Sequence, residues 1–128
     1  MIVVDSCGWL EYFGNGPNAA RFASAIEALD ELLVPSVVLH EVFKHLLRRT
    51  GEPAALKGVS WMRQGRVLAC EESTALQAAK LAIQYRLATA DSLILATAQA
   101  HGAELWTQDA DFETVPGVRY FPKLAVHN

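Results

Sequence analysis

The stretch Ile2-Val3-Val4-Asp5-Ser6 decides the fold, because a short β-branched run passes directly into polar residues that begin a helix. β-Branched side chains favour strands, and Asp or Ser is a preferred N-terminal cap of a helix. The same pattern of a near-continuous apolar strand followed by a helix recurs along the chain. Such strands are typical of a parallel sheet that helices cover on both faces. We therefore expect a three-layer α/β fold, with a twisted parallel sheet of four to five strands flanked by helices.

The other elements follow from apolar periodicity and from turn residues. We expect further strands at residues 32–34, 67–70, 103–107 and 118–121. We expect helices at residues 6–13, 18–29, 36–50, 52–61, 73–85 and 90–101. In the second helix Leu29 belongs to the apolar face, and in the third Ser36 is the expected cap.

Length and composition indicate one globular domain over residues 1–128, because 52% of the residues are hydrophobic and 20% are charged. The N-terminus carries no basic leader, and no apolar run approaches the roughly 18 residues of a membrane span. Cys7 and Cys70 form no CxxC pair, so we expect both to be free and buried. These features predict a soluble protein of the cytoplasm with no membrane partner.

Charge is distributed unevenly along the chain, whose net charge is −3. Residues 42–70 hold six basic residues and one acidic residue, whereas the rest holds five basic and thirteen acidic residues. One interpretation is a solvated helical face. The other is a basic rim that binds the phosphates of a nucleic acid, with Lys44, Arg48 and Arg49 as the candidate contacts.

Four acids lie where apolar segments give way to polar ones, namely Asp5, Glu41, Asp91 and Asp109. Taken singly, each has a structural explanation as a helix cap, a first-turn acid, a turn residue or a member of a surface ion pair. Ligands of parallel α/β sheets bind beyond the carboxyl ends of the strands, where these acids are expected to converge. Clustered carboxylates repel one another and need protons or a divalent cation. The sequence therefore predicts a metal centre.

Four segments resemble, in order and spacing, the PIN-domain ribonucleases, and within them the VapC-type toxins of bacterial toxin–antitoxin pairs. They are residues 3–6, 35–41, 87–98 and 105–112. The resemblance implies a PIN-like fold and an endoribonuclease that depends on Mg²⁺ or Mn²⁺. It also implies that Asp5, Glu41, Asp91 and Asp109 are the catalytic and metal-binding acids. Mg²⁺ prefers such hard oxygen ligands independently of the family.

The resemblance implies further roles and partners. Ser6 and Thr107 match small hydroxyl residues that would orient the carboxylates or a bound water, and Asp111 is a further candidate ligand, ranked below Asp109. The expected partners are RNA, a cognate antitoxin and a second copy of the chain, with a groove for the antitoxin near residues 9–13 and 37–47. Two other functions stay open: a non-catalytic RNA- or partner-binding module, and an acid-dependent phosphatase suggested by the DxD pattern of residues 109–111.

Overall fold

The structure is a computed structural model and describes residues 1–125. These residues contain one sheet of five parallel strands in the order β3-β2-β1-β4-β5. The strands are β1 (Ile2–Val4), β2 (Leu32–Pro35), β3 (Arg66–Leu68), β4 (Glu104–Thr107) and β5 (Val118–Tyr120). The predicted α/β class and parallel sheet are confirmed, and the third strand begins one residue earlier than predicted and ends two residues earlier.

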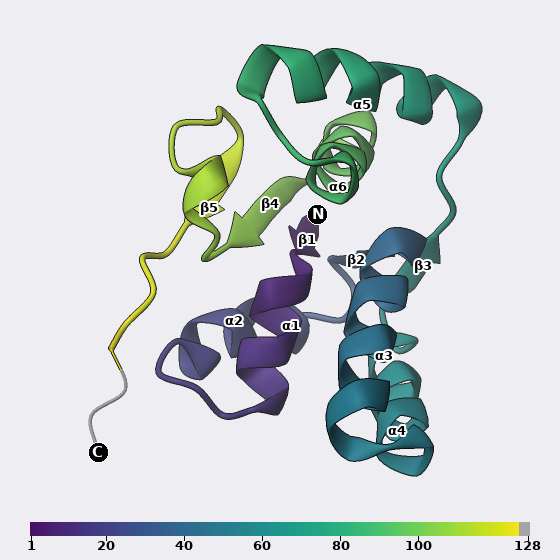
Figure 1. The fold of residues 1–128 in the computed structure, drawn as a ribbon, viewed down its shortest axis with the longest axis vertical. Helices are drawn as coiled ribbons and strands as arrows, with labels where there is room; N and C mark the ends of the chain where they lie inside the picture. Colours follow the sequence, from purple (N-terminus) through teal and green to yellow (C-terminus); the bar gives the residue numbers. More distant parts are fainter. Residues whose placement is uncertain (126–128) are drawn as a thin grey trace.

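The described residues form six α-helices, which pack around the sheet as three pairs, α1 with α2, α3 with α4, and α5 with α6. Their bounds are α1 (Ser6–Phe13), α2 (Ala19–Ile26), α3 (Ser36–Thr50), α4 (Glu52–Met62), α5 (Glu72–Tyr85) and α6 (Thr89–Ala100), and a short 3-10 turn, η1, spans Ala110–Phe112. Figure 1 shows α5 and α6 above the strands and the other two pairs below them. No helix among residues 1–125 is long and apolar enough to cross a membrane.

The central strands are apolar on both faces because helices cover both faces. Val3, Val4, Leu33, Val34 and Leu105 are all at most 1% exposed. This burial explains why the strands are continuous apolar runs in the sequence rather than alternating ones.

All strands are parallel, but β2 and β3 follow β1 on one side of the sheet, whereas β4 and β5 lie on its other side. Val4 pairs with Trp106, and the Asp5 amide donates to the Trp106 carbonyl at 2.9 Å. The carboxyl ends of β1 and β4 therefore adjoin. In open parallel sheets this topological switch point is where ligands bind.

Three details of the sequence prediction are wrong. The N-cap of α3 is Pro35 and Ser36 makes no capping bond, because β2 extends to Pro35, which pairs with Leu68, and leaves no loop before the helix. Helix α2 ends at Ile26, so Leu29 lies beyond it and is 44% exposed. Cys70 is exposed, because it follows β3 at the edge of the sheet; both cysteines are free, as predicted.

Candidate metal centre

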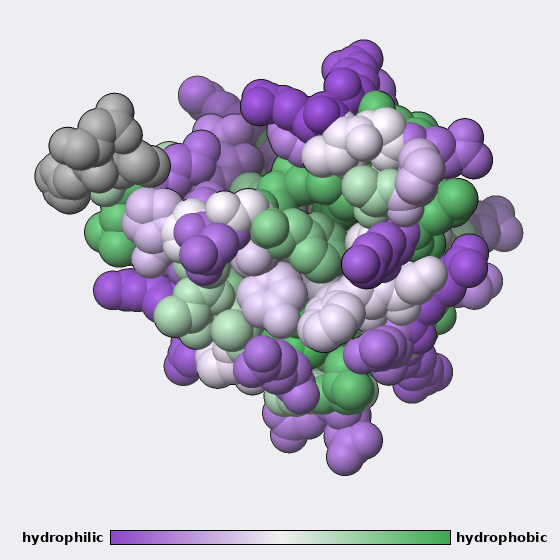
Figure 2. Space-filling model, turned by 90° about the horizontal axis from the view of Figure 1, so that it is seen from below, coloured by the Kyte–Doolittle hydropathy of each residue, from purple (hydrophilic) through white to green (hydrophobic). Residues whose placement is uncertain are grey.

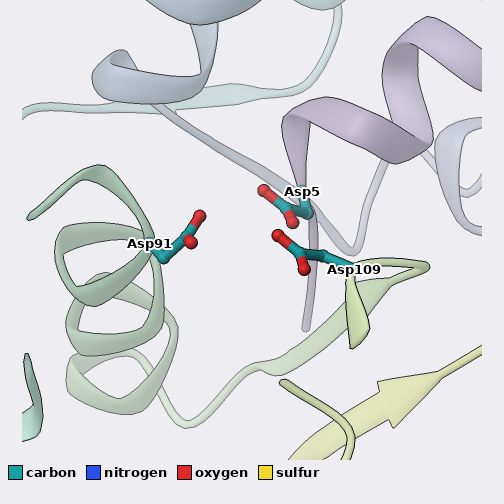
Figure 3. Close-up of side chains that lie close together, drawn as sticks. All are labelled: Asp5, Asp91 and Asp109. Carbon is teal, nitrogen blue, oxygen red and sulfur yellow. The ribbon is translucent and has the colours of Figure 1, made fainter. Parts of the chain in front are cut away.

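Three carboxylates from three elements converge at the switch point. Asp5 directly follows β1, Asp91 lies in the first turn of α6, and Asp109 is the second residue after β4. A carboxylate oxygen from each lies within 4.8 Å of the other two. Figure 3 shows the three side chains pointing toward a common space. Asp5 is only 2% exposed, whereas Asp91 and Asp109 are half-buried and reach solvent.

Two of these acids also cap the element that follows them. Asp5 Oδ1 accepts a hydrogen bond from the Ser6 amide at 2.8 Å, and Asp109 Oδ1 accepts one from the Asp111 amide at 2.9 Å. A carboxylate oxygen has more than one lone pair, so capping leaves each acid able to bind a cation. The capping explanation and the metal-binding explanation of these residues are therefore compatible.

Thr107 connects two members of the cluster from behind. Its fully buried hydroxyl donates to Asp5 Oδ2 at 2.8 Å and accepts from the Asp109 amide at 3.0 Å. The Ser6 hydroxyl is a weaker neighbour, 3.5 Å from Asp5 Oδ1. The structure thus places both predicted hydroxyl residues against Asp5.

Glu41 lies at the margin of the cluster, on the second turn of α3. Its Oε1 is buried and has no hydrogen-bond partner among residues 1–125. Burial raises the pKa of Glu41, and the nearby charge of Asp5 raises it further, while a hydrogen bond from Ser6 and the proximity of His40 act in the opposite direction. Its position fits a fourth acid that acts beside the three rather than among them.

The cluster holds negative charge that nearby cationic side chains do not neutralise. Burial raises the pKa of Asp5 despite its three hydrogen bonds. Burial, followed by the charges of Asp5, Asp109 and Glu41, raises the pKa of Asp91 to about 7. Across the described residues, the only ion pair joins Arg119 to Glu104, away from these acids. A set of hard oxygen atoms with excess negative charge and one unpartnered buried oxygen beside it fits a hard divalent cation.

The other predicted site residues, Asp111 and three basic residues of α3, lie at different distances from the acids. Asp111 is exposed and lies outside the three-carboxylate cluster, although its charge also contributes to the raised pKa of Asp91. Lys44 and Arg48 line a hollow together with Glu41. Arg49 is exposed and does not line that hollow.

Two residues beside the cluster carried no signal in the sequence. Cys7 Sγ lies 3.4 Å from Asp5 Oδ2 and 3.3 Å from Thr107 Oγ1. Burial raises the pKa of its thiol to about 12, so the thiol stays protonated and donates to Asp5.

The second residue is Asn18, which is fully buried. Its Nδ2 donates to Gln108 Oε1 and to the Pro122 carbonyl, both at 3.0 Å, and so holds the residue before Asp109. Its partners lie 90 and 104 positions away, so only the fold reveals the contact.

Comparison with known proteins identifies the class of this fold. The family model for the PIN domain matches residues 2–118, so the chain belongs to the PIN-domain family. No curated protein sequence matches the chain significantly. The family match confirms the resemblance seen in the sequence.

Solved structures of the same fold include toxins. A chain of a toxin–antitoxin complex from Klebsiella pneumoniae is 22% identical, with a TM-score of 0.78, and the match covers 97% of this chain and 100% of that one. VapC20 of Mycobacterium tuberculosis, a toxin that cleaves the sarcin–ricin loop, is 18% identical with a TM-score of 0.75 over 91% and 95% of the two chains. VapBC2 from Rickettsia felis, solved with a promoter DNA fragment, is 15% identical with a TM-score of 0.75 over 95% and 98%. At these identities the likeness concerns the fold.

Proposed function

We propose that this chain is a divalent-metal-dependent endoribonuclease that hydrolyses RNA phosphodiesters, and that it is the toxin of a type II toxin–antitoxin pair. The observation that carries the proposal is the convergence of Asp5, Asp91 and Asp109, with Glu41 beside them. Membership of the PIN-domain family and the toxins of like fold support it. We take residues 1–128 as one catalytic domain that acts in the cytoplasm.

The acids of the chain have distinct tasks in this proposal. Asp5, Asp91 and Asp109 hold Mg²⁺ or Mn²⁺, and Glu41 accepts a proton or a hydrogen bond at the margin. The bound ion supplies Lewis-acid activation of water and neutralises charge on the phosphate. Thr107, Ser6 and Cys7 hold Asp5 in one orientation, so the site is formed before the substrate arrives.

Cleavage of a labelled RNA by the purified protein tests the proposal. We expect products in Mg²⁺ or Mn²⁺ and none in EDTA. Asp91→Asn and Asp109→Asn should each abolish cleavage, because each removes one charge from the cluster without changing its volume. Asp111→Asn is the matched control, since Asp111 is exposed and lies outside the cluster, and it should retain most of the activity.

Other outcomes point to the alternative functions. Cleavage that persists in EDTA contradicts the metal site, and so does cleavage by both single variants, Asp91→Asn and Asp109→Asn. RNA affinity without cleavage at any divalent ion favours a non-catalytic binding module. Hydrolysis of a generic phosphomonoester with no action on RNA favours the phosphatase.

We propose that an apolar segment of the antitoxin occupies a groove of about 450 Å³ between α1, α3 and α4. Its walls include Tyr12, Phe13 and Leu46, which lie in the two segments predicted to form an antitoxin groove, and Trp61 of α4, which is 45% exposed. The aromatic rings of Tyr12 and Trp61 lie 6.5 Å apart. Figure 2, a view of the molecule from below, shows pale and hydrophobic surface at the centre and hydrophilic side chains around it. Such a groove suits an amphipathic helix, and a basic residue of the antitoxin would complement the acid cluster.

Co-expression with the small protein encoded beside this gene tests the groove. We expect the two proteins to purify together and Trp61→Ala to reduce the yield of the complex at least tenfold. Leu29→Ala removes an exposed apolar side chain of the α2–β2 loop, and it should leave the complex intact. Equal yields from Trp61→Ala and the wild type place the antitoxin elsewhere.

We also propose a homodimer. The support is a pair of apolar side chains on α5, Leu76 and Ile83, which are 65% and 84% exposed. They lie seven residues apart, on one face of the helix.

A further inference from the structure

A second hollow, of about 370 Å³, runs along α3 beside the acid cluster. Glu41, Lys44, His45 and Arg48 line it from α3, and Ala90 lines it from α6. Ala90 immediately precedes Asp91, and the charge of Glu41 raises the pKa of Asp91, so the hollow begins where the acid cluster ends.

The charge of the hollow changes sign along its length. Positions 41, 44 and 48 lie on one face of α3, and the helical rise puts Lys44 about 4.5 Å and Arg48 about 10.5 Å beyond Glu41 along the axis. Within the described part of the chain neither basic side chain forms an ion pair. Both are exposed, so their charges are available to a ligand.

The α6 wall also favours an anion. Helix α6 has Ala88 at its N-cap and no side-chain cap, so its first amide groups have no partner within the helix. The positive end of the helix dipole adds to the field of Lys44 and Arg48, and Asp91 in the first turn of α6 opposes it at the metal end. An anion in the hollow would thus meet its main positive charge on α3, at Lys44 and Arg48, beyond Glu41 and Asp91.

We infer that this hollow is a binding subsite for an RNA backbone phosphate next to the one that is cleaved. The inference rests on the proposed ribonuclease function. An RNA strand whose scissile phosphate lies at Asp5, Asp91 and Asp109 would place its next phosphate beyond Glu41, near Lys44 and Arg48. His45 and His40 provide further polar contacts along the same path. Arg49, although adjacent in sequence to Arg48, does not line the hollow and does not contribute.

Binding of a fluorescein-labelled single-stranded RNA in EDTA, where cleavage is absent, tests the inference. We expect Lys44→Gln with Arg48→Gln to weaken binding at least tenfold. The slope of log K against log salt should fall by about 0.7 for each phosphate that the variant no longer neutralises. The matched double variant Arg49→Gln with Lys57→Gln removes the same charge outside the hollow and should stay within twofold of the wild type. In Mg²⁺ the first variant should raise KM and leave kcat nearly unchanged.

The outcomes separate this inference from the proposed function. Equal weakening by both double variants, or no RNA binding by the wild type, overturns the subsite. Competition by single-stranded DNA supports it, since the hollow contacts phosphate. If only the Lys44→Gln, Arg48→Gln variant binds RNA more weakly and the wild type cleaves no RNA in Mg²⁺ or Mn²⁺, the phosphate site is supported and the nuclease function is contradicted. If the wild type cleaves RNA but the two double variants bind it equally well, the nuclease function is supported and the phosphate site is contradicted. Equal melting temperatures of both variants show that neither change acts through unfolding.

Discussion

Thr107 has no exposed surface, yet its hydroxyl bonds to both Asp5 and the backbone of Asp109. Thr107→Val keeps the shape of the side chain, removes both bonds and leaves Asp5 held by Ser6 and Cys7 alone. We expect Mn²⁺ affinity and RNA cleavage to fall about ten- to hundredfold, as for other groups that orient metal ligands. Titration calorimetry with Mn²⁺ measures the first and gel assays measure the second. Thr107→Ser, which keeps the hydroxyl, should recover most of both, and equal loss in the two variants contradicts an orienting role.

Asp91 makes the metal-free protein sensitive to pH. Its pKa is raised from 3.8 to about 7, so the folded state keeps the proton over a range in which the unfolded chain loses it. The unfolded state then binds fewer protons, and the free energy of unfolding in EDTA should fall as the pH rises from about 4 to about 7 and level off above 7. Divalent ions require the ionised form, so their affinity should weaken as the pH falls below 7.

The Asp91→Asn variant isolates this effect. Its thermal unfolding in EDTA should depend less on pH between 5 and 7 than that of the wild type, and it should be the more stable protein at pH 8. The prediction is wrong if the two pH profiles of melting temperature run parallel. Asp111→Asn provides the control, because Asp111 is exposed and contributes least to the shift.

At the residue scale, the positions of the acids and of Ser6 and Thr107 could be predicted, but the roles of Cys7 and Asn18 could not. Asp5 and Asp109 follow apolar strands, so local sequence marks them as strand-end residues. Cys7 contacts Thr107 across 100 positions, and Asn18 contacts Gln108 across 90. Such contacts leave no local pattern, because burial and partner are both set by the tertiary fold.

At the element scale, α1 packs against α2 and β1 with no room for a side chain at Gly8. A Cβ there would lie 2.7 Å from two ring carbons of Phe22 and 2.7 Å from Val4 Cγ1. Phe22 and Val4 are fully buried, and protein interiors are close-packed. We expect Gly8→Ala to lower the free energy of unfolding by about 1–3 kcal/mol, the usual cost of overpacking. Urea denaturation measures the change.

Gly58 in α4 is the matched control. A Cβ at this position would approach only the end of the flexible Leu46 side chain closely, at 2.7 Å. Rotation of Leu46 relieves that contact, and Ala gains about 0.5–1 kcal/mol over Gly inside a helix. Gly58→Ala should therefore leave stability unchanged or raise it. Similar losses at Gly8 and Gly58 would show that the contact with Leu46 yields no more easily than the contact with Phe22, whereas gains at both sites would show that helix propensity, not packing, decides the outcome.

Element boundaries were predictable where turn residues mark them and less so elsewhere. Gly51 separates α3 from α4 as expected, with a positive φ of 82° that favours glycine. The bounds of α3 agree with the prediction, but its cap was mispredicted because Pro35 serves both as the last residue of β2 and as the N-cap of the helix. Sequence patterns assign each residue to one helix, strand or loop, so they do not predict that Pro35 both ends β2 and caps α3.

At the scale of the whole molecule, the strand order places the acids but periodicity alone does not give that order. The sequence predicts parallel strands, and the convergence of Asp5 with Asp109 requires in addition that β1 and β4 be neighbours. That adjacency depends on pairing over about a hundred residues, between Val4 and Trp106. It became an expectation only through the general rule for parallel sheets and the resemblance to the PIN domain.

The outer face of α5 permits a decisive test of the oligomeric state. Leu76 and Ile83 are the most exposed large hydrophobic side chains among residues 1–125, at 65% and 84%. Two copies of α5 related by a twofold axis would bury both residues of each chain, because such an interface uses the same patch twice. We expect light scattering to give the mass of a dimer for the wild type. Ile83→Glu should yield a monomer, because it would bury two unpaired carboxylates at the interface.

Leu29→Glu is the control for this substitution, since it places the same charge at an exposed apolar site of the α2–β2 loop. It should remain a dimer. A wild type that is monomeric at all concentrations contradicts the homodimer. A dimeric Ile83→Glu variant contradicts an interface on α5. Asp5, Asp91 and Asp109 all belong to a single chain, so a monomeric Ile83→Glu variant should still bind Mn²⁺ with the affinity of the wild type. Loss of Mn²⁺ binding on dissociation would show instead that the second copy stabilises α6, which packs against α5 and carries Asp91.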